Sequence, residues 1–165
     1  MIESLRALLT DPGIPSLHPM VVHFPIALIC LAPLFDLACL VFRSRLWLDR
    51  TATTLYLVGT LGAGAAFLSG QRAAEAVESL TPAAESVLAD HEAQAVLTLI
   101  VLAVATLLRL MVTWLGRDDR RIKVGIFRLL ALPVAIAALA MMVLTADLGG
   151  QLVYKHGVGV TIEAE

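Results

Sequence analysis

Four long apolar stretches, at about residues 20–42, 51–70, 91–115 and 126–147, constrain the fold of this chain more than any other feature. Each approaches the ~20 residues that an α-helix needs to cross the hydrocarbon core of a bilayer. A helix satisfies its own backbone hydrogen bonds in lipid, and short connections favour antiparallel neighbours. The sequence therefore predicts a single all-α membrane domain, an up-down bundle of four transmembrane helices, with tails at residues 1–18 and 148–165.

The composition agrees with a lipid environment. Of the 165 residues, 59% are hydrophobic and 16% are charged, whereas soluble domains contain about 45–50% apolar and about 25% charged residues. The formal net charge of -2 gives no reason to expect a nucleic-acid partner. The N-terminus does not resemble a cleaved signal peptide, because Glu3, Arg6 and Asp11 precede the first apolar stretch. We expect this stretch to remain in the mature protein.

Basic residues gather in and beside two loops that the bundle would place on one side of the membrane. They are Arg43, Arg45, Arg50, Arg109, Arg117, Arg120, Arg121, Lys123 and Arg128. The positive-inside rule makes that side cytoplasmic. We therefore expect a multi-pass protein of a bacterial inner membrane, with both termini on the periplasmic or extracellular side.

All four histidines fall on the predicted outer side, namely His18, His23, His91 and His156. A neutral imidazole is a common ligand, and its second ring nitrogen usually bonds to a carboxylate or a carbonyl. The histidines are therefore the candidate cofactor ligands. We expect His23 and His91 to form the inner pair, because both lie at the edge of a span. The candidate partners of the ligand rings are Asp90, Glu92, Asp147 and Tyr154.

The identity of a bound group stays open at this stage. His18 and His23 are not three or four residues apart, the spacing that aligns two ligands on a helical face. The chain also has no CxxC, CxxCH or HExxH motif. A b-type haem that exchanges electrons with periplasmic carriers or quinol is one interpretation, and copper or zinc is a variant of it. A structural or accessory membrane subunit without a cofactor is the alternative. The sequence does not decide whether the chain is an enzyme or forms a homo-oligomer.

Two charges lie deep inside predicted spans, Asp36 in the first and Arg109 in the third. Intramembrane charges are normally paired or face the interior of a bundle. The sequence predicts a structural ion pair between Asp36 and Arg109, or from Asp36 to Arg128.

Proline and glycine mark three further features. Thr81 and Pro82 read as the N-cap and first residue of the third helix, which would then start outside the membrane. The small residues Gly62, Ala66 and Gly70 form one smooth helical face, suited to close helix packing or to a flat cofactor. The glycine-rich stretch GGQLVYKHGVGV, residues 149–160, is expected to be an extended segment on the outer face.

Two strings of residues, one near each end, resemble a bacterial membrane family known as domain of unknown function 2231. The resemblance covers about residues 15 to 160. It rests on His18, Pro19, His23, Phe24 and Pro25, and on Gly149, Gly150, Leu152, Val153, Tyr154, Gly157, Val158, Gly159 and Val160. It implies a four-helix inner-membrane protein of unassigned activity, and similar domains are in some proteins joined to iron–sulfur or cytochrome-type electron carriers.

Overall fold

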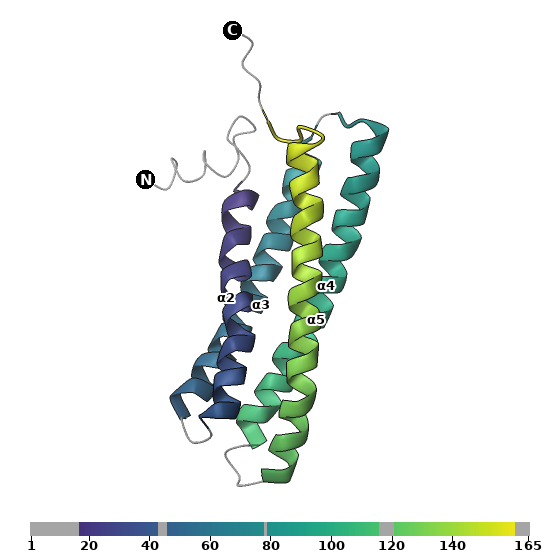
Figure 1. Ribbon diagram of the computed structural model, residues 1–165. Helices are drawn as coiled ribbons and strands as arrows, with labels where there is room; N and C mark the ends of the chain where they lie inside the picture. Colours follow the sequence, from purple (N-terminus) through teal and green to yellow (C-terminus); the bar gives the residue numbers. More distant parts are fainter. Residues whose placement is uncertain (1–16, 43–45, 78, 116–120, 161–165) are drawn as a thin grey trace, which may run out of the picture.

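The computed structural model describes residues 17–42, 46–77, 79–115 and 121–160, with the backbone alone at 121–126 and 128. Its helices are α2 (His18–Val41), α3 (Leu46–Glu75), α4 (Pro82–Leu115) and α5 (Arg121–Tyr154). They run side by side and alternate in direction, so that α2 and α4 begin at the same end of the bundle (Figure 1). Each contains a stretch long and apolar enough to cross a membrane. The predicted all-α bundle of four transmembrane helices is confirmed.

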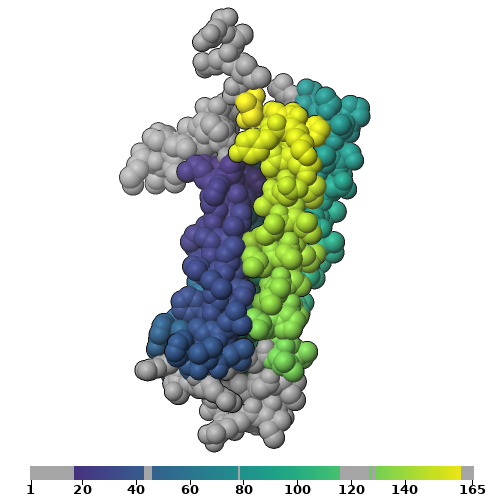
Figure 2. Space-filling model, in the orientation of Figure 1, coloured from purple at the N-terminus to yellow at the C-terminus, as the bar shows by residue number. Residues whose placement is uncertain are grey.

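The bundle consists of two helical hairpins. Helix α2 packs mainly on α3, and α4 packs mainly on α5. Contact between the hairpins comes chiefly from α3 and α4, with a smaller contribution from α2 and α5, which lie side by side on the face seen in Figure 2. We call the end at which α2 and α4 begin the histidine end, because His18 is the first residue of α2.

Alanine and medium-sized aliphatic side chains, together with Tyr56, fill the thin core. One buried cluster combines Ile29, Leu102, Ala138 and Met142, and a second combines Ala32, Tyr56, Ala105 and Ala135. Alanine lets helix axes approach closely, which matters in lipid because dispersion contacts drive helix association there. Large apolar side chains such as Leu61 and Leu129 instead face outward. This arrangement suits a bundle whose solvent is hydrocarbon.

Two expectations about helix starts and helix packing are confirmed. The α4 helix begins at Pro82, and the backbone N–H of Ala84 donates to Oγ1 of Thr81 at 3.3 Å. On α3, a Cβ atom placed at Gly62 would lie 3.2 Å from Cδ1 of Phe24. The smooth face of α3 therefore serves close packing against α2.

The extended segment predicted for residues 149–160 is wrong in its first half. Helix α5 continues to Tyr154, so Gly149 and Gly150 are helical. The chain leaves the helix only afterwards, where Gly157 and Gly159 adopt positive φ values of 67° and 75°. Glycine is typical of turns, but a helical glycine also leaves room beside the backbone, and at Gly149 the imidazole of His91 lies in that room.

Candidate functional site

His18 lies against α3. Its Nδ1 atom is 3.0 Å from the backbone oxygen of Ala66 and 3.1 Å from Oγ of Ser69. A carbonyl oxygen only accepts hydrogen bonds, so Nδ1 carries the proton and donates. The Ser69 hydroxyl itself donates to the same carbonyl at 2.8 Å, which leaves its lone pairs free to accept from His18. In a neutral imidazole, Nε2 then has the unprotonated lone pair.

His91 is held in the same manner in the other hairpin. Its Nδ1 atom is 3.0 Å from the backbone oxygen of Thr145 on α5, so Nδ1 again donates and Nε2 keeps a lone pair. Thr145 is itself fixed by a 2.8 Å hydrogen bond between its hydroxyl and that of Thr98 on α4. The ring of His91 is thus anchored to the neighbouring helix by the backbone of that helix.

A glycine lies beside each imidazole, four residues after the carbonyl that accepts from it. A Cβ atom at Gly70 would lie 2.9 Å from Cε1 of His18, and one at Gly149 would lie 3.2 Å from Cε1 of His91. Both distances are shorter than the ~3.5–4.0 Å optimum for carbon atoms. Glycine at these two positions therefore lets each ring approach the neighbouring helix.

The two anchored imidazoles lie toward the same end of the bundle, one in each hairpin. Both side chains are only partly buried. We define His18 and His91, which are anchored in the same way toward the histidine end of the bundle, as the histidine pair.

The other two histidines have different surroundings. His23 is exposed, and its Nδ1 atom bonds to the backbone oxygen of Pro19 within its own helix. His156 follows the end of α5 and is partly buried. The structure thus anchors His18, rather than the expected His23, against a neighbouring helix in the way that it anchors His91.

The side chains expected around the ligands lie mostly at the surface. Asp90, Glu92, Asp147 and Tyr154 are all exposed. Glu92 interacts electrostatically with its neighbour His91, and Asp147 accepts a 2.7 Å hydrogen bond from Nε2 of Gln151. The ring partners that the structure shows are instead the carbonyls of Ala66 and Thr145 and the hydroxyl of Ser69.

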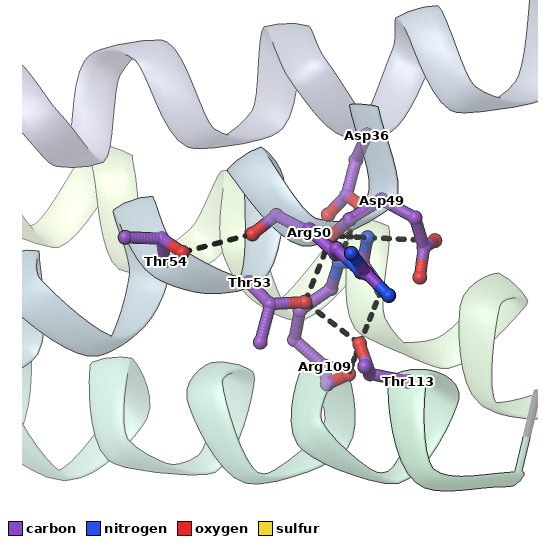
Figure 3. Close-up of polar contacts among 7 residues, drawn as sticks. All are labelled: Asp36, Asp49, Arg50, Thr53, Thr54, Arg109 and Thr113. Atoms are coloured by element: carbon purple, nitrogen blue, oxygen red, sulfur yellow. Dashed lines mark hydrogen bonds and ion pairs between the residues drawn. The ribbon is translucent and has the colours of Figure 1, made fainter. Parts of the chain in front are cut away.

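Figure 3 shows a second polar cluster, which lies near the ends of α2 and α4 and thus away from the histidine end. Nε of Arg109 on α4 is 2.8 Å from Oδ1 of Asp36 on α2, and both side chains are almost completely buried. The predicted ion pair between these residues is therefore confirmed. The same guanidinium donates from NH2 to Oδ1 of Asp49 at 2.9 Å. Asp49, in the first turn of α3, was not anticipated.

Hydroxyl groups surround this ion pair. The Tyr56 hydroxyl interacts with the Asp36 carboxylate. Thr53 and Thr113 share a 2.7 Å hydrogen bond between α3 and α4, and Thr60 and Thr106 share one of 2.6 Å. The two threonine pairs join the two hairpins, as expected where lipid offers no competing partner.

Four bilayer-length helices, outward-facing apolar side chains and a paired charge in the interior define an integral membrane protein. The chain belongs to the DUF2231 family, described as predicted membrane proteins, whose family model matches residues 14–162. Comparisons with curated proteins and with solved structures gave no match.

Proposed function

We propose that this protein binds b-type haem between His18 and His91 and exchanges electrons at the outer face of the membrane. The observation that carries the proposal is the shared anchoring of the histidine pair. Each ring comes from a different hairpin, donates from Nδ1 to a backbone carbonyl and lies against a glycine.

This geometry supplies what an axial haem ligand requires. A hydrogen bond from Nδ1–H to a carbonyl fixes the tautomer and orientation of the imidazole and raises the basicity of Nε2. Histidine is a standard axial ligand, and cofactor sites between the helices of a bundle are built from inward-facing side chains. A bound haem would supply one-electron redox chemistry. The protein would contribute the two ligands and their fixed orientation.

The number of ligands favours haem over zinc or copper. Structural zinc sites take four protein ligands and catalytic ones three, and blue-copper sites combine two histidines with a cysteine. Among the described residues, His, Cys, Asp and Glu side chains form no group of three or more that could hold a metal ion. Haem needs only two axial ligands from the protein, a number that the histidine pair provides.

The connections between the hairpins also suit a group at this end. The hydrogen bonds of Thr53 with Thr113, of Thr60 with Thr106, and of Arg109 with Asp49 lie in the half of the bundle away from the histidine end. A planar group ligated by His18 and His91 would add a connection between the hairpins at the histidine end, away from these hydrogen bonds.

The distribution of basic residues supports an outer location of the site. The loops rich in Lys and Arg follow the ends of α2 and α4, opposite the histidine end. The positive-inside rule then places the histidine end outside. Periplasmic electron carriers, or quinol arriving from the lipid, are the partners that such a site could reach in a bacterial inner membrane.

Absorption spectroscopy tests the proposal. Full-length protein, expressed with a haem supply and purified in mild detergent, should show a Soret band and the sharp visible bands of a low-spin haem with two histidine ligands. His18→Ala or His91→Ala should remove these bands or convert them to those of a high-spin haem. His23→Ala and His156→Ala are the matched controls and should keep them.

Two results would contradict the proposal. Wild-type protein that binds no haem would favour an accessory subunit without a cofactor. Haem that stays low-spin in a variant lacking both His18 and His91 would move the site elsewhere.

A further inference from the structure

The buried positions of α2 recur in α4 at a constant shift of 73 residues, the separation of His18 and His91. The shift relates every buried residue of α2 to a buried residue of α4. The matched pairs are Pro25 and Thr98, Ile29 and Leu102, Ala32 and Ala105, Pro33 and Thr106, Asp36 and Arg109, and Cys39 and Val112. Since the residue types mostly differ, a simple reading of the sequence does not reveal the repeat.

The second helix of each hairpin repeats in the same way, with a shift of 79 residues, the separation of Gly70 and Gly149. Three of the five buried residues of α3 match buried residues of α5, namely Ala52 and Ala131, Tyr56 and Ala135, and Gly59 and Ala138. The other two, Leu48 and Ala66, match the partly buried Phe127 and Thr145. The same shift relates Ala66 to Thr145, whose carbonyls accept from His18 and His91. The two hairpins therefore bury corresponding positions and anchor their histidines through corresponding atoms.

The correspondence defines two units, His18–Glu75 and His91–Tyr154. Helices α2 and α4 run in the same direction (Figure 1), and α3 packs on α4 as α2 packs, less extensively, on α5. An approximate two-fold axis along the bundle would relate the units in this way. At the histidine end, His18 matches His91 and Gly70 matches Gly149. At the other end the matched residues are Asp36 and Arg109, which have opposite charges and contact each other at 2.8 Å.

We propose that the chain is a tandem duplication of a two-helix unit, and that Asp36 and Arg109 make each unit pair with the other rather than with a copy of itself. Two first units would bring Asp36 against Asp36, and two second units would bring Arg109 against Arg109. Either arrangement buries like charges, whereas the pairing within one chain neutralises them. The remaining core contacts are mostly apolar and do not discriminate in this way.

The charges at a second pair of matched positions agree with this pairing specificity. Asp49, which also binds Arg109, corresponds by the shift of 79 residues to Arg128. The first unit is thus acidic, and the second basic, at two matched positions. Such complementary charges are a common means by which similar helices select their partners.

A complementation experiment with the full chain separates this role from that of an ordinary ion pair. In Arg109→Asp both matched positions are acidic, and in Asp36→Arg both are basic. Each variant is expressed alone and together with the other, with different affinity tags on the two. Between the chains, Asp36 can pair with Arg109, and the two introduced residues can pair with each other. Wild-type copies with the two tags, and one chain carrying both substitutions, serve as controls.

We expect the two variants to accumulate together and to co-purify at least several-fold more than either variant does with itself. The chain with both substitutions should accumulate more than either single variant and exchange little with other copies, although its carboxylate at position 109 loses the contact with Asp49. Co-purification of the mixed variants at the level of the wild-type copies would overturn the proposal. Failure of the mixed variants and of the doubly substituted chain to accumulate more than the single variants would also overturn it, because opposite charges at the two matched positions would then not suffice for pairing.

Discussion

Replacing Gly70 by alanine should weaken the protein, whereas the same change at Gly64 in the same helix should strengthen it. A Cβ at position 70 would lie 2.9 Å from Cε1, 3.3 Å from Nδ1 and 3.4 Å from Nε2 of His18. A Cβ at Gly64 would have nothing within 4 Å. The two substitutions add the same methyl group to α3, so their difference isolates the contact with the imidazole.

The expected magnitude follows from two opposing terms. Alanine in place of glycine inside a helix stabilises by about 1 kcal/mol. At Gly70 the ring of His18 would have to retreat by roughly 0.6 Å to reach an ordinary carbon contact, and overpacking of this kind destabilises by about 1–3 kcal/mol. The ring cannot turn away freely, because its Nδ1 atom donates to Ala66 and Ser69. Gly70→Ala should therefore be about 1–3 kcal/mol less stable than Gly64→Ala.

Reversible unfolding in mixed micelles of mild detergent and dodecyl sulfate, followed by circular dichroism, measures this difference. In haem-loaded protein, Gly70→Ala should also alter the low-spin spectrum, while Gly64→Ala leaves it unchanged. Gly149→Ala should act in the same direction but less strongly, since its Cβ would lie 3.2 Å from His91. Equal free energies of unfolding for Gly70→Ala and Gly64→Ala, with unchanged spectra, would refute the role assigned to the glycine.

Three further predictions concern the other interactions. Arg109→Met should reduce the free energy of unfolding by about 3–5 kcal/mol, because it removes the guanidinium from the buried Asp36. A smaller loss in the double variant Asp36→Leu, Arg109→Met would confirm this cause, whereas equal losses in the two variants would contradict it. A double-mutant cycle of Thr98→Val and Thr145→Val should give a coupling energy near ~0.6 kcal/mol for the bond between α4 and α5, whereas additive effects would show that the bond contributes nothing. A reporter active only in the cytoplasm, fused after Glu165, should stay silent. Reporter activity would show that the C-terminus is cytoplasmic and that the expected orientation is wrong.

The ion pair shows how far the sequence constrains tertiary contacts. Asp36 and Arg109 are isolated charges within apolar stretches, and lipid leaves such charges few partners besides each other. The sequence therefore predicted that Asp36 pairs with Arg109 or Arg128, and the structure shows the pair with Arg109. Asp49 was not predictable in the same way, because it lies at the start of α3, where an acidic residue is common without any partner.

The histidine pair shows where prediction from sequence stopped. Both His18 and His23 lie at the beginning of α2, but five residues of helix separate them by about 140° around its axis. His18 turns toward α3, so His23 lies on the exposed face. Only the rotation of α2 against its neighbour decides which of the two is anchored.

The sequence by itself determined three features: four helices in a membrane, pairing of the deep charges, and the location of all histidines toward one end. They follow from the length of the apolar stretches, the cost of burying a charge and the places of the histidines relative to those stretches, all of which depend on residue type. The tertiary structure alone decided which imidazoles are anchored and why Gly70 and Gly149 flank them. The rings bond to backbone carbonyls, which every residue has, so residue type does not identify the partner. Each glycine matters because it lacks a Cβ atom, and this leaves space for the imidazole. Neither the carbonyl partner nor the role of the missing Cβ atom can be inferred from the sequence until the packing of the two helices is known.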